Sequence, residues 1–202
     1  MSDIAVDVVI LPPAEVSAEV IDLNRELCRK DRRIRLDRAA VLPHISLFMS
    51  SIPRARLAET ISCLDTVLAR YAAMSVTLTG VSYGGFDAMN IVSSLALAPT
   101  PPLLALHREV CDALAGLRTA PTTPEQFANA DAVDENSRRY VEEFLAEHAY
   151  ERFDPHITVG FGRLERVPEV GEFTADRVAI CQLGPYCTCR KVLYQADLAP
   201  AS

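Results

Sequence analysis

Two short segments of the chain repeat the same order of side chains. The first reads P-H-I-S-L over residues 43–47, and the second reads P-H-I-T-V over residues 155–159. The chain has four histidines, and His44 and His156 occupy equivalent positions of this repeat. An imidazole has an ordinary pKa of about 6.5, so two of them can hold opposite protonation states at neutral pH and serve as an acid–base pair.

The repeat also predicts which way its side chains point. On a strand, residues two positions apart share a face. His44 therefore shares a face with Ser46, and His156 with Thr158, while the aliphatic residues between them enter the core. One such segment alone is typical of a buried strand with a hydrogen-bonded histidine. Two matching copies in opposite halves of the chain favour a shared functional site, to which each strand brings one imidazole and one hydroxyl.

The elements around the repeat indicate an α+β fold of short antiparallel strands with helices packed outside. We expect strands where Val and Ile are dense, and helices where apolar residues recur every three or four positions. The expected strands cover residues 4–11, 41–50, 75–83, 90–98, 153–161, 177–183 and 188–198, and the expected helices cover 15–30, 53–71, 101–118 and 137–148. No glycine-rich loop follows the first strand, so the dinucleotide fingerprint and the P-loop are both absent from the sequence. The length suits one domain over residues 1–202.

Composition limits the kinds of partner. The formal net charge of −7 argues against a protein that coats long nucleic acid, because such binding rests on many Lys and Arg contacts to phosphate. A basic stretch over residues 25–38 is either a solvated surface or a patch that steers phosphate. No apolar run approaches the roughly 20 residues of a membrane helix, and the N-terminus carries acidic residues where a signal peptide carries basic ones. We expect a cytoplasmic protein with no membrane partner, and its oligomeric state stays open.

The six cysteines do not predict a metal site. Three of them fall in helical patterns, where a free thiol packs as a small apolar group. Cys187 and Cys189 share a strand face next to the strand that carries Cys181, but no convincing second pair of zinc ligands accompanies them. We expect no metal, no cofactor and, in a cytosolic chain, no disulfide.

The chain resembles the two-histidine (2H) phosphoesterase superfamily, also called LigT-like or 2',5'-RNA-ligase-like. The resemblance rests on the double motif, its separation by more than half of the chain, and the order of strands and helices up to the closing segment C-Q-L-G-P-Y-C-T-C-R-K-V-L. It implies a bilobal fold of two pseudo-symmetric antiparallel sheets with a groove between them that holds His44, Ser46, His156 and Thr158. It also implies a metal-free phosphodiesterase, with the 2',3'-cyclic phosphate of RNA ends or small nucleotides as the leading substrate.

The residue types suit that reaction. One histidine would deprotonate the attacking water, and the other would protonate the leaving oxygen. The hydroxyls of Ser46 and Thr158 would stabilise charge on the phosphoryl oxygens. Two neutral hydroxyls give modest help, so backbone N–H groups or a cation would assist. The candidate cations are Arg163, Arg190 and Lys191.

Three aromatic residues near predicted loops are candidates to stack a base, although each also reads as a core or rim residue. They are Tyr83, Phe86 and Tyr186, and Tyr186, in the turn G-P-Y, is the leading candidate. The two histidines outside the repeat lie in or near helices and are interpreted as ordinary structural residues. Three alternative functions stay open: a nucleotide-binding regulatory module, a hydrolase of cyclic sugar phosphates, and a hydrolase of 2',5'-linked oligonucleotides.

Overall fold

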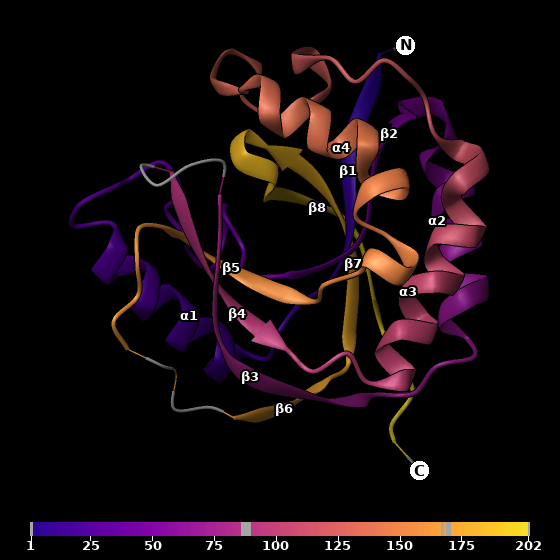
Figure 1. Ribbon diagram of the computed structural model, residues 1–202. Helices are drawn as coiled ribbons and strands as arrows, with labels where there is room; N and C mark the ends of the chain where they lie inside the picture. Colours follow the sequence, from indigo (N-terminus) through magenta and orange to yellow (C-terminus); the bar gives the residue numbers. More distant parts are fainter. Residues whose placement is uncertain (1, 86–89, 167, 169–170, 202) are drawn as a thin grey trace.

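The chain folds around one curled antiparallel sheet (Figure 1), and this computed structural model describes residues 2–85, 90–166, 168 and 171–201. The strands in this part of the chain are β1 (Asp3–Ile10), β2 (Ile45–Pro53), β3 (Met74–Gly85), β4 (Ile91–Leu97), β5 (His156–Phe161), β6 (Glu172–Ala175), β7 (Arg177–Gly184) and β8 (Thr188–Asp197). The α-helices are α1 (Ala14–Leu27), α2 (Leu57–Leu68), α3 (Pro101–Leu114) and α4 (Glu135–Glu147). The 3-10 helices are η1 (Arg54–Arg56), η2 (Ala115–Leu117), η3 (Pro124–Gln126), η4 (Ala130–Ala132), η5 (Tyr150–Arg152) and η6 (Pro185–Cys187). The predicted α+β class is confirmed.

The sheet has two related halves. Its strand order is β6-β3-β4-β5-β2-β1-β7-β8, so the two strands that carry the repeated motif are neighbours at the centre. From β5 the sheet continues through β4, β3 and β6, and from β2 it continues through β1, β7 and β8. A single residue pair, Ile45 opposite Ile157, joins β2 to β5. We call this pair the central rung, and it makes the two expected sheets continuous with each other.

Helices hold both motif strands from the core side. Helices α2 and α3 lie side by side (Figure 1), and α3 packs on β2. There the Nδ1 of His107 donates a hydrogen bond to the Leu47 carbonyl at 2.8 Å. Helix α1 packs on β5, where the Asn24 side-chain amide donates to the Val159 carbonyl at 2.7 Å. Each motif strand is thus fixed by a polar side chain from a helix as well as by apolar packing.

Several boundaries differ from the sequence-based expectation. Strand β2 begins at Ile45 rather than at residue 41, and β5 begins at His156 rather than at residue 153. In both cases a proline lies just before, and proline has no N–H to give to a ladder. The helix expected over 53–71 starts as the 3-10 turn η1 and continues as α2. The short strand β6, which pairs with β3, was not predicted, because four residues carry too little periodic signal.

None of the described helices is long and apolar enough to cross a membrane.

Candidate active site

The two histidines lie at equivalent points of the sheet, each one residue before its member of the central rung. Burial alternates along both motif segments as predicted. The aliphatic members are fully buried: Ile45, Leu47, Ile157 and Val159. The polar members remain partly exposed: His44, Ser46, His156 and Thr158. The imidazoles and hydroxyls therefore share the open face of the sheet.

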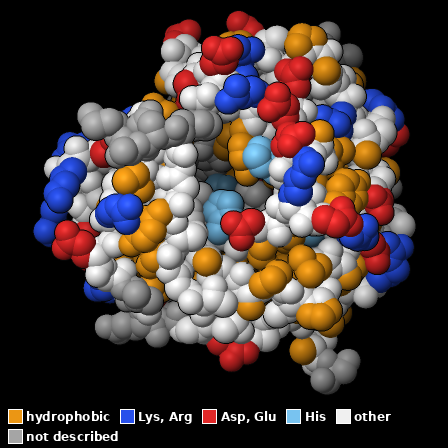
Figure 2. Space-filling view, in the orientation of Figure 1, with side chains coloured by type: hydrophobic (Ala, Val, Ile, Leu, Met, Phe, Trp, Pro, Cys, Tyr) orange, Lys and Arg blue, Asp and Glu red, His pale blue; other side chains and the backbone are white. Residues whose placement is uncertain are grey.

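A groove with a volume of about 660 Å³ lies over this face and is lined by all four polar motif residues. Helix α4 and the residue after it form one wall, and the β3–β4 strands form the opposite wall. Figure 2 shows histidine side chains in a hollow near the middle of the molecule. The groove that the resemblance implied is present, and the repeated motif supplies part of its lining.

Both motif histidines have the same fixed orientation. The Nδ1 of His44 bonds to the Leu42 carbonyl at 2.8 Å, and the Nδ1 of His156 bonds to the Asp154 carbonyl at 2.8 Å. A carbonyl oxygen can only accept, so each Nδ1 carries the proton in the neutral ring. Each Nε2 then has a lone pair with which to take a proton from another molecule.

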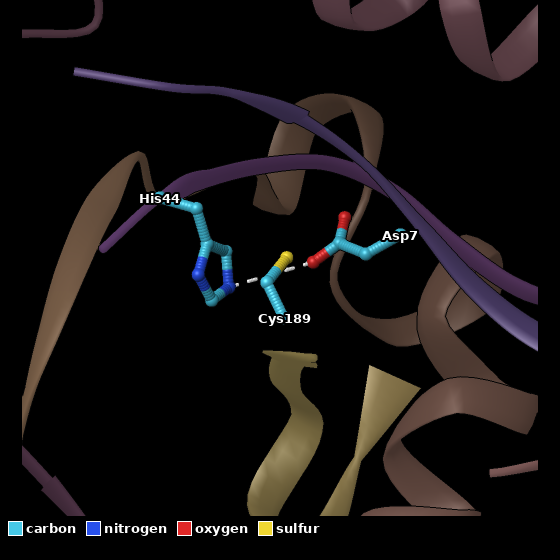
Figure 3. A group of neighbouring side chains, drawn as sticks. All are labelled: Asp7, His44 and Cys189. Atoms are coloured by element: carbon cyan, nitrogen blue, oxygen red, sulfur yellow. Dashed lines mark ion pairs between the residues drawn. The ribbon is translucent and has the colours of Figure 1, made fainter. Parts of the chain in front are cut away.

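A buried carboxyl group lies beside the first histidine (Figure 3). Asp7, on β1, is fully buried. Its Oδ2 accepts a hydrogen bond from the Ser46 hydroxyl at 2.7 Å and lies 3.6 Å from the Nε2 of His44. Its Oδ1 is buried and has no hydrogen-bond partner among the residues that the structure describes. The Cys189 thiol, on β8, completes this cluster.

Burial disfavours charge on both members of the Asp7–His44 pair. It raises the pKa of Asp7 well above its ordinary value, an effect that the hydrogen bond from Ser46 opposes. Burial also lowers the pKa of His44 to about 4, against the effect of the bond to Leu42 and with a further lowering from the charge of His156. The His44 ring is therefore neutral at neutral pH.

Sequence reasoning missed Asp7, although a signal was available. The strand reads A-V-D-V-V-I, and a single acidic residue inside such an apolar run cannot avoid burial. His148 was interpreted as ordinary, yet it lines the groove and its ring stacks on Tyr140 at 4.1 Å between centroids. The position of that ring depends on tertiary packing, so no pattern in the sequence could have indicated it.

The aromatic residues predicted to stack a base differ in where the structure places them. Tyr186 lines the groove, with its ring edge-on to Phe161 at 5.2 Å. Its φ of 58° is in the left-handed region, so the turn before β8 holds this side chain at some backbone cost. Phe86 lies outside the described residues.

The three candidate cations do not line the groove in the described structure. Arg163 is exposed and stacks over the ring of Tyr83 at 4.6 Å, and Lys191 is also exposed. Arg190 packs on Gly184 and donates from Nε to the Thr188 hydroxyl at 2.9 Å. Among the described lining residues, the basic side chain is Arg139, which is 4.0 Å from Glu143.

The basic stretch over residues 25–38 contributes both apolar and cationic contacts near the groove. Ile34 and Leu36 are part of the lining. The guanidinium of Arg33 stacks on the ring of Phe161 at 3.6 Å and forms an ion pair with Asp31 at 2.6 Å. This part of the stretch is therefore packed against the site rather than freely solvated.

Comparison with known proteins places the chain in a family. The family described as the 2'-5' RNA ligase superfamily matches residues 11–180, a span that contains both motifs. The chain belongs to this superfamily of 2H phosphoesterases. No curated protein matches the chain.

Solved structures share the fold over nearly the whole chain. TT0787 of Thermus thermophilus is 17% identical, with a TM-score of 0.61 over 98% of this chain and 100% of that one. LigT of E. coli in its apo form is 15% identical, with a TM-score of 0.56 over 98% and 99%. LigT complexed with 3'-AMP is 14% identical, with a TM-score of 0.53 over 98% and 99%.

Proposed function

We propose that this chain is a metal-independent phosphodiesterase that hydrolyses a cyclic phosphate, with His44 and His156 as its acid–base pair. The observation that carries the proposal is the matched orientation of the two imidazoles. Both are held through Nδ1 by a backbone carbonyl, and both line one groove together with a hydroxyl side chain. Membership of the 2H phosphoesterase superfamily supports chemistry on a phosphoester.

The unequal surroundings of the two rings support one assignment of their roles. A general acid must start protonated, and a group with a pKa of about 4 is not protonated at neutral pH. His44 is therefore the base, which removes a proton from the attacking water through Nε2. The new P–O bond forms as the ester P–O bond breaks, and His156 gives its proton to the leaving oxygen. Ser46 and Thr158 donate hydrogen bonds to the phosphoryl oxygens.

Features of the groove favour a small nucleotide-like substrate. Its volume of about 660 Å³ is typical of a small-molecule site. The rings of Tyr83, Phe161 and Tyr186 line it and offer apolar faces to a base. The scarcity of basic side chains in the described lining gives a long polyanion little to bind. A nucleoside 2',3'-cyclic phosphate, or the cyclic end of a short RNA, fits these properties, and LigT has been crystallised with 3'-AMP.

The alternatives differ in what they predict. A hydrolase of cyclic sugar phosphates would turn over substrates that lack a base, and a 2',5'-phosphodiesterase would cleave linear dinucleotides. A nucleotide-binding regulatory module would bind nucleotides without turnover. The intact histidine and hydroxyl in both motifs favour an enzyme over a binding module.

The test is phosphorus NMR of the purified chain with EDTA and a panel of substrates. The panel contains nucleoside 2',3'-cyclic phosphates, cyclic sugar phosphates and 2',5'-linked dinucleotides. We expect the cyclic nucleotides to convert to a single phosphomonoester, and the doubly substituted H44A/H156A chain to convert none. If only another member of the panel is turned over, that compound becomes the proposed substrate. If nucleotides bind saturably without turnover, the chain is a nucleotide-binding module and the proposed enzyme activity is wrong.

A further inference from the structure

We infer that His44, Cys189 and Asp7 form a binding site for a zinc-like metal ion, and that metal binding and phosphodiester turnover exclude each other. The ligand atoms are the Nε2 of His44, the Sγ of Cys189 and a carboxylate oxygen of Asp7. The exclusion rests on the proposed function, because His44 is shared with the proposed acid–base pair. The binding of the ion does not depend on that function and can be measured separately.

The geometry is close to that of a metal site. The three ligand atoms lie within 4.8 Å of one another, and the Nε2 of His44 is 3.6 Å from the Oδ2 of Asp7. In a tetrahedral zinc site with bonds of about 2.0–2.3 Å, neighbouring ligand atoms are roughly 3.3–3.8 Å apart. The histidine–aspartate edge therefore already has the required length, and small side-chain movements would bring the sulfur in. Figure 3 shows the three side chains converging, with Asp7 from β1, Cys189 from β8 and His44 from the residue just before β2.

Charge balance favours an ion of charge +2 at this place. Asp7 and Cys189 are each fully buried, and the side chain of His44 is 11% exposed. With a carboxylate, a thiolate and a neutral imidazole, the complex with Zn²⁺ has no net charge, which suits a buried position. When the ion binds, the thiol proton of Cys189 and any proton held by the Asp7 carboxyl leave to solvent. Within the described part of the chain the Oδ1 of Asp7 accepts no hydrogen bond, so this oxygen is available as a metal ligand.

The donor set selects the metal. Thiolate and imidazole ligands suit Zn²⁺, whereas Mg²⁺ and Ca²⁺ prefer oxygen ligands. Three protein ligands leave a fourth position for water, as catalytic zinc sites do. Here, however, the ion occupies the Nε2 lone pair that the proposed base needs, so it inhibits the enzyme. Since His44 lines the groove, the ion reaches the site from there.

A second buried cysteine next to a histidine provides a matched control. The Sγ of Cys111 lies 3.7 and 3.8 Å from the two ring nitrogens of His107. Both nitrogens are already engaged, because Nδ1 donates to Leu47 and Nε2 accepts from the Tyr150 amide at 2.8 Å. The C111A variant therefore removes an equally buried thiol without touching the inferred metal ligands.

The binding test is a titration of the chelator-stripped full chain with Co²⁺, which reports thiolate ligation by a charge-transfer absorption band. We expect one equivalent of Co²⁺ to produce the band in the wild type and in C111A. The band should be absent from C189A and C189S, and D7N should bind Co²⁺ at least 10-fold more weakly. Circular dichroism and melting temperature identify any variant that fails to fold. Two different substitutions are made at Cys189 so that the test still stands if one of them does not fold. No band in the wild type, or an unchanged band in a folded Cys189 variant, overturns the site.

The exclusion is tested on the substrate found by phosphorus NMR. We expect one equivalent of Zn²⁺ to remove most of the turnover in the wild type and C111A, and EDTA to restore it. Measured against its own metal-free turnover, the C189A variant should need at least 10-fold more Zn²⁺ for the same fractional inhibition. Equal sensitivity of wild type and C189A overturns the exclusion. If no substrate is ever turned over, the proposed function fails, while the Co²⁺ result still decides the metal site.

Discussion

The two halves of the groove present the same motif in different surroundings. In one half, His44 and Ser46 both meet the buried carboxyl of Asp7. In the other, His156 has the same backbone contact through Nδ1, but across the described residues it has no ion-pair partner. The repeat supplies two imidazoles with matching backbone contacts, and Asp7 on the neighbouring strand β1 makes their surroundings unequal. Acid–base catalysis by two histidines needs this inequality, because the pair must start in opposite protonation states.

The largest effect is expected from removing either histidine. We expect H44A and H156A each to lower the chemical step by about 10²–10⁴-fold, the usual weight of one general acid or base. The double variant should lose little beyond the worse single variant, since residues that act as a unit are not additive. The measurement is single-turnover kinetics, and the wild-type rate should be bell-shaped against pH.

The control for these variants is H107A. It removes two buried hydrogen bonds, so it should lower the melting temperature while leaving turnover per folded molecule nearly unchanged. Equal and small losses in all three variants would mean that the two motif histidines are not the proton carriers.

A smaller effect is expected from making the two halves alike. We expect D7N to lower kcat by about 10-fold, because the Asp7 carboxyl can become negatively charged beside the His44 imidazolium that forms during the reaction and an amide cannot, and a contact to a charged group contributes about 1.5 kcal/mol or more. The pH profile of kcat should change shape, since one of the coupled groups no longer titrates. A D7N enzyme with wild-type kcat and pH profile would show that Asp7 does not differentiate the halves.

The two hydroxyls should differ in their effect on stability more than on turnover. We expect S46A and T158A each to reduce turnover by about 5-fold, the weight of one neutral hydrogen bond of roughly 1 kcal/mol. Only S46A also removes the hydrogen-bond donor of a buried carboxyl, and it should lower the free energy of unfolding by about 1–3 kcal/mol more than T158A does. Denaturant unfolding measures the difference, and equal stabilities would contradict the Ser46–Asp7 bond.

The contribution of Asp7 to stability can be measured through the pH dependence of the free energy of unfolding. Its folded-state pKa is raised, so between the unfolded value of about 3.9 and the folded value the native state binds more protons than the unfolded state does. Wild-type stability therefore falls as pH rises through that window. The D7N variant lacks this fall, so its stability relative to wild type should increase with pH from about 4 upward. Denaturant unfolding of both proteins over a series of pH values, with EDTA present, gives the comparison. If the difference in the free energy of unfolding between D7N and wild type stays constant with pH, the raised pKa of Asp7 does not account for the pH dependence of stability.

The smallest expected effect on the proposed reaction is that of a chelator. We expect EDTA to leave the turnover of metal-free enzyme unchanged, because two imidazoles supply the acid and the base. Protein purified with zinc bound should gain activity. Loss of activity on chelation, restored by zinc or manganese, would contradict the metal-independent mechanism.

The sequence was sufficient for the local part of this site. The period of two fixed the faces of His44 and His156, and the burial of Ile45 and Ile157 confirms it. The asymmetry could not be predicted in the same way, because Asp7, Ser46 and Cys189 come from three strands whose register depends on the whole sheet. Closeness in sequence to the second motif makes Arg163 a candidate cation, whereas no such closeness supports Arg190. In the structure, Arg163 and Arg190 instead contact Tyr83 and Thr188.

The central rung has a geometric consequence. Each histidine directly precedes one member of this residue pair, so the spacing of the two histidine backbones is set at a single place in the sheet. The two half-sheets are also joined at their far margin, where Ala72 bridges to Ala199, so the rung is not their only connection. The walls of the groove come from other elements, namely α4 and the β3–β4 strands. Substitutions in these walls can therefore fit the groove to different substrates while the spacing of the two imidazoles stays unchanged.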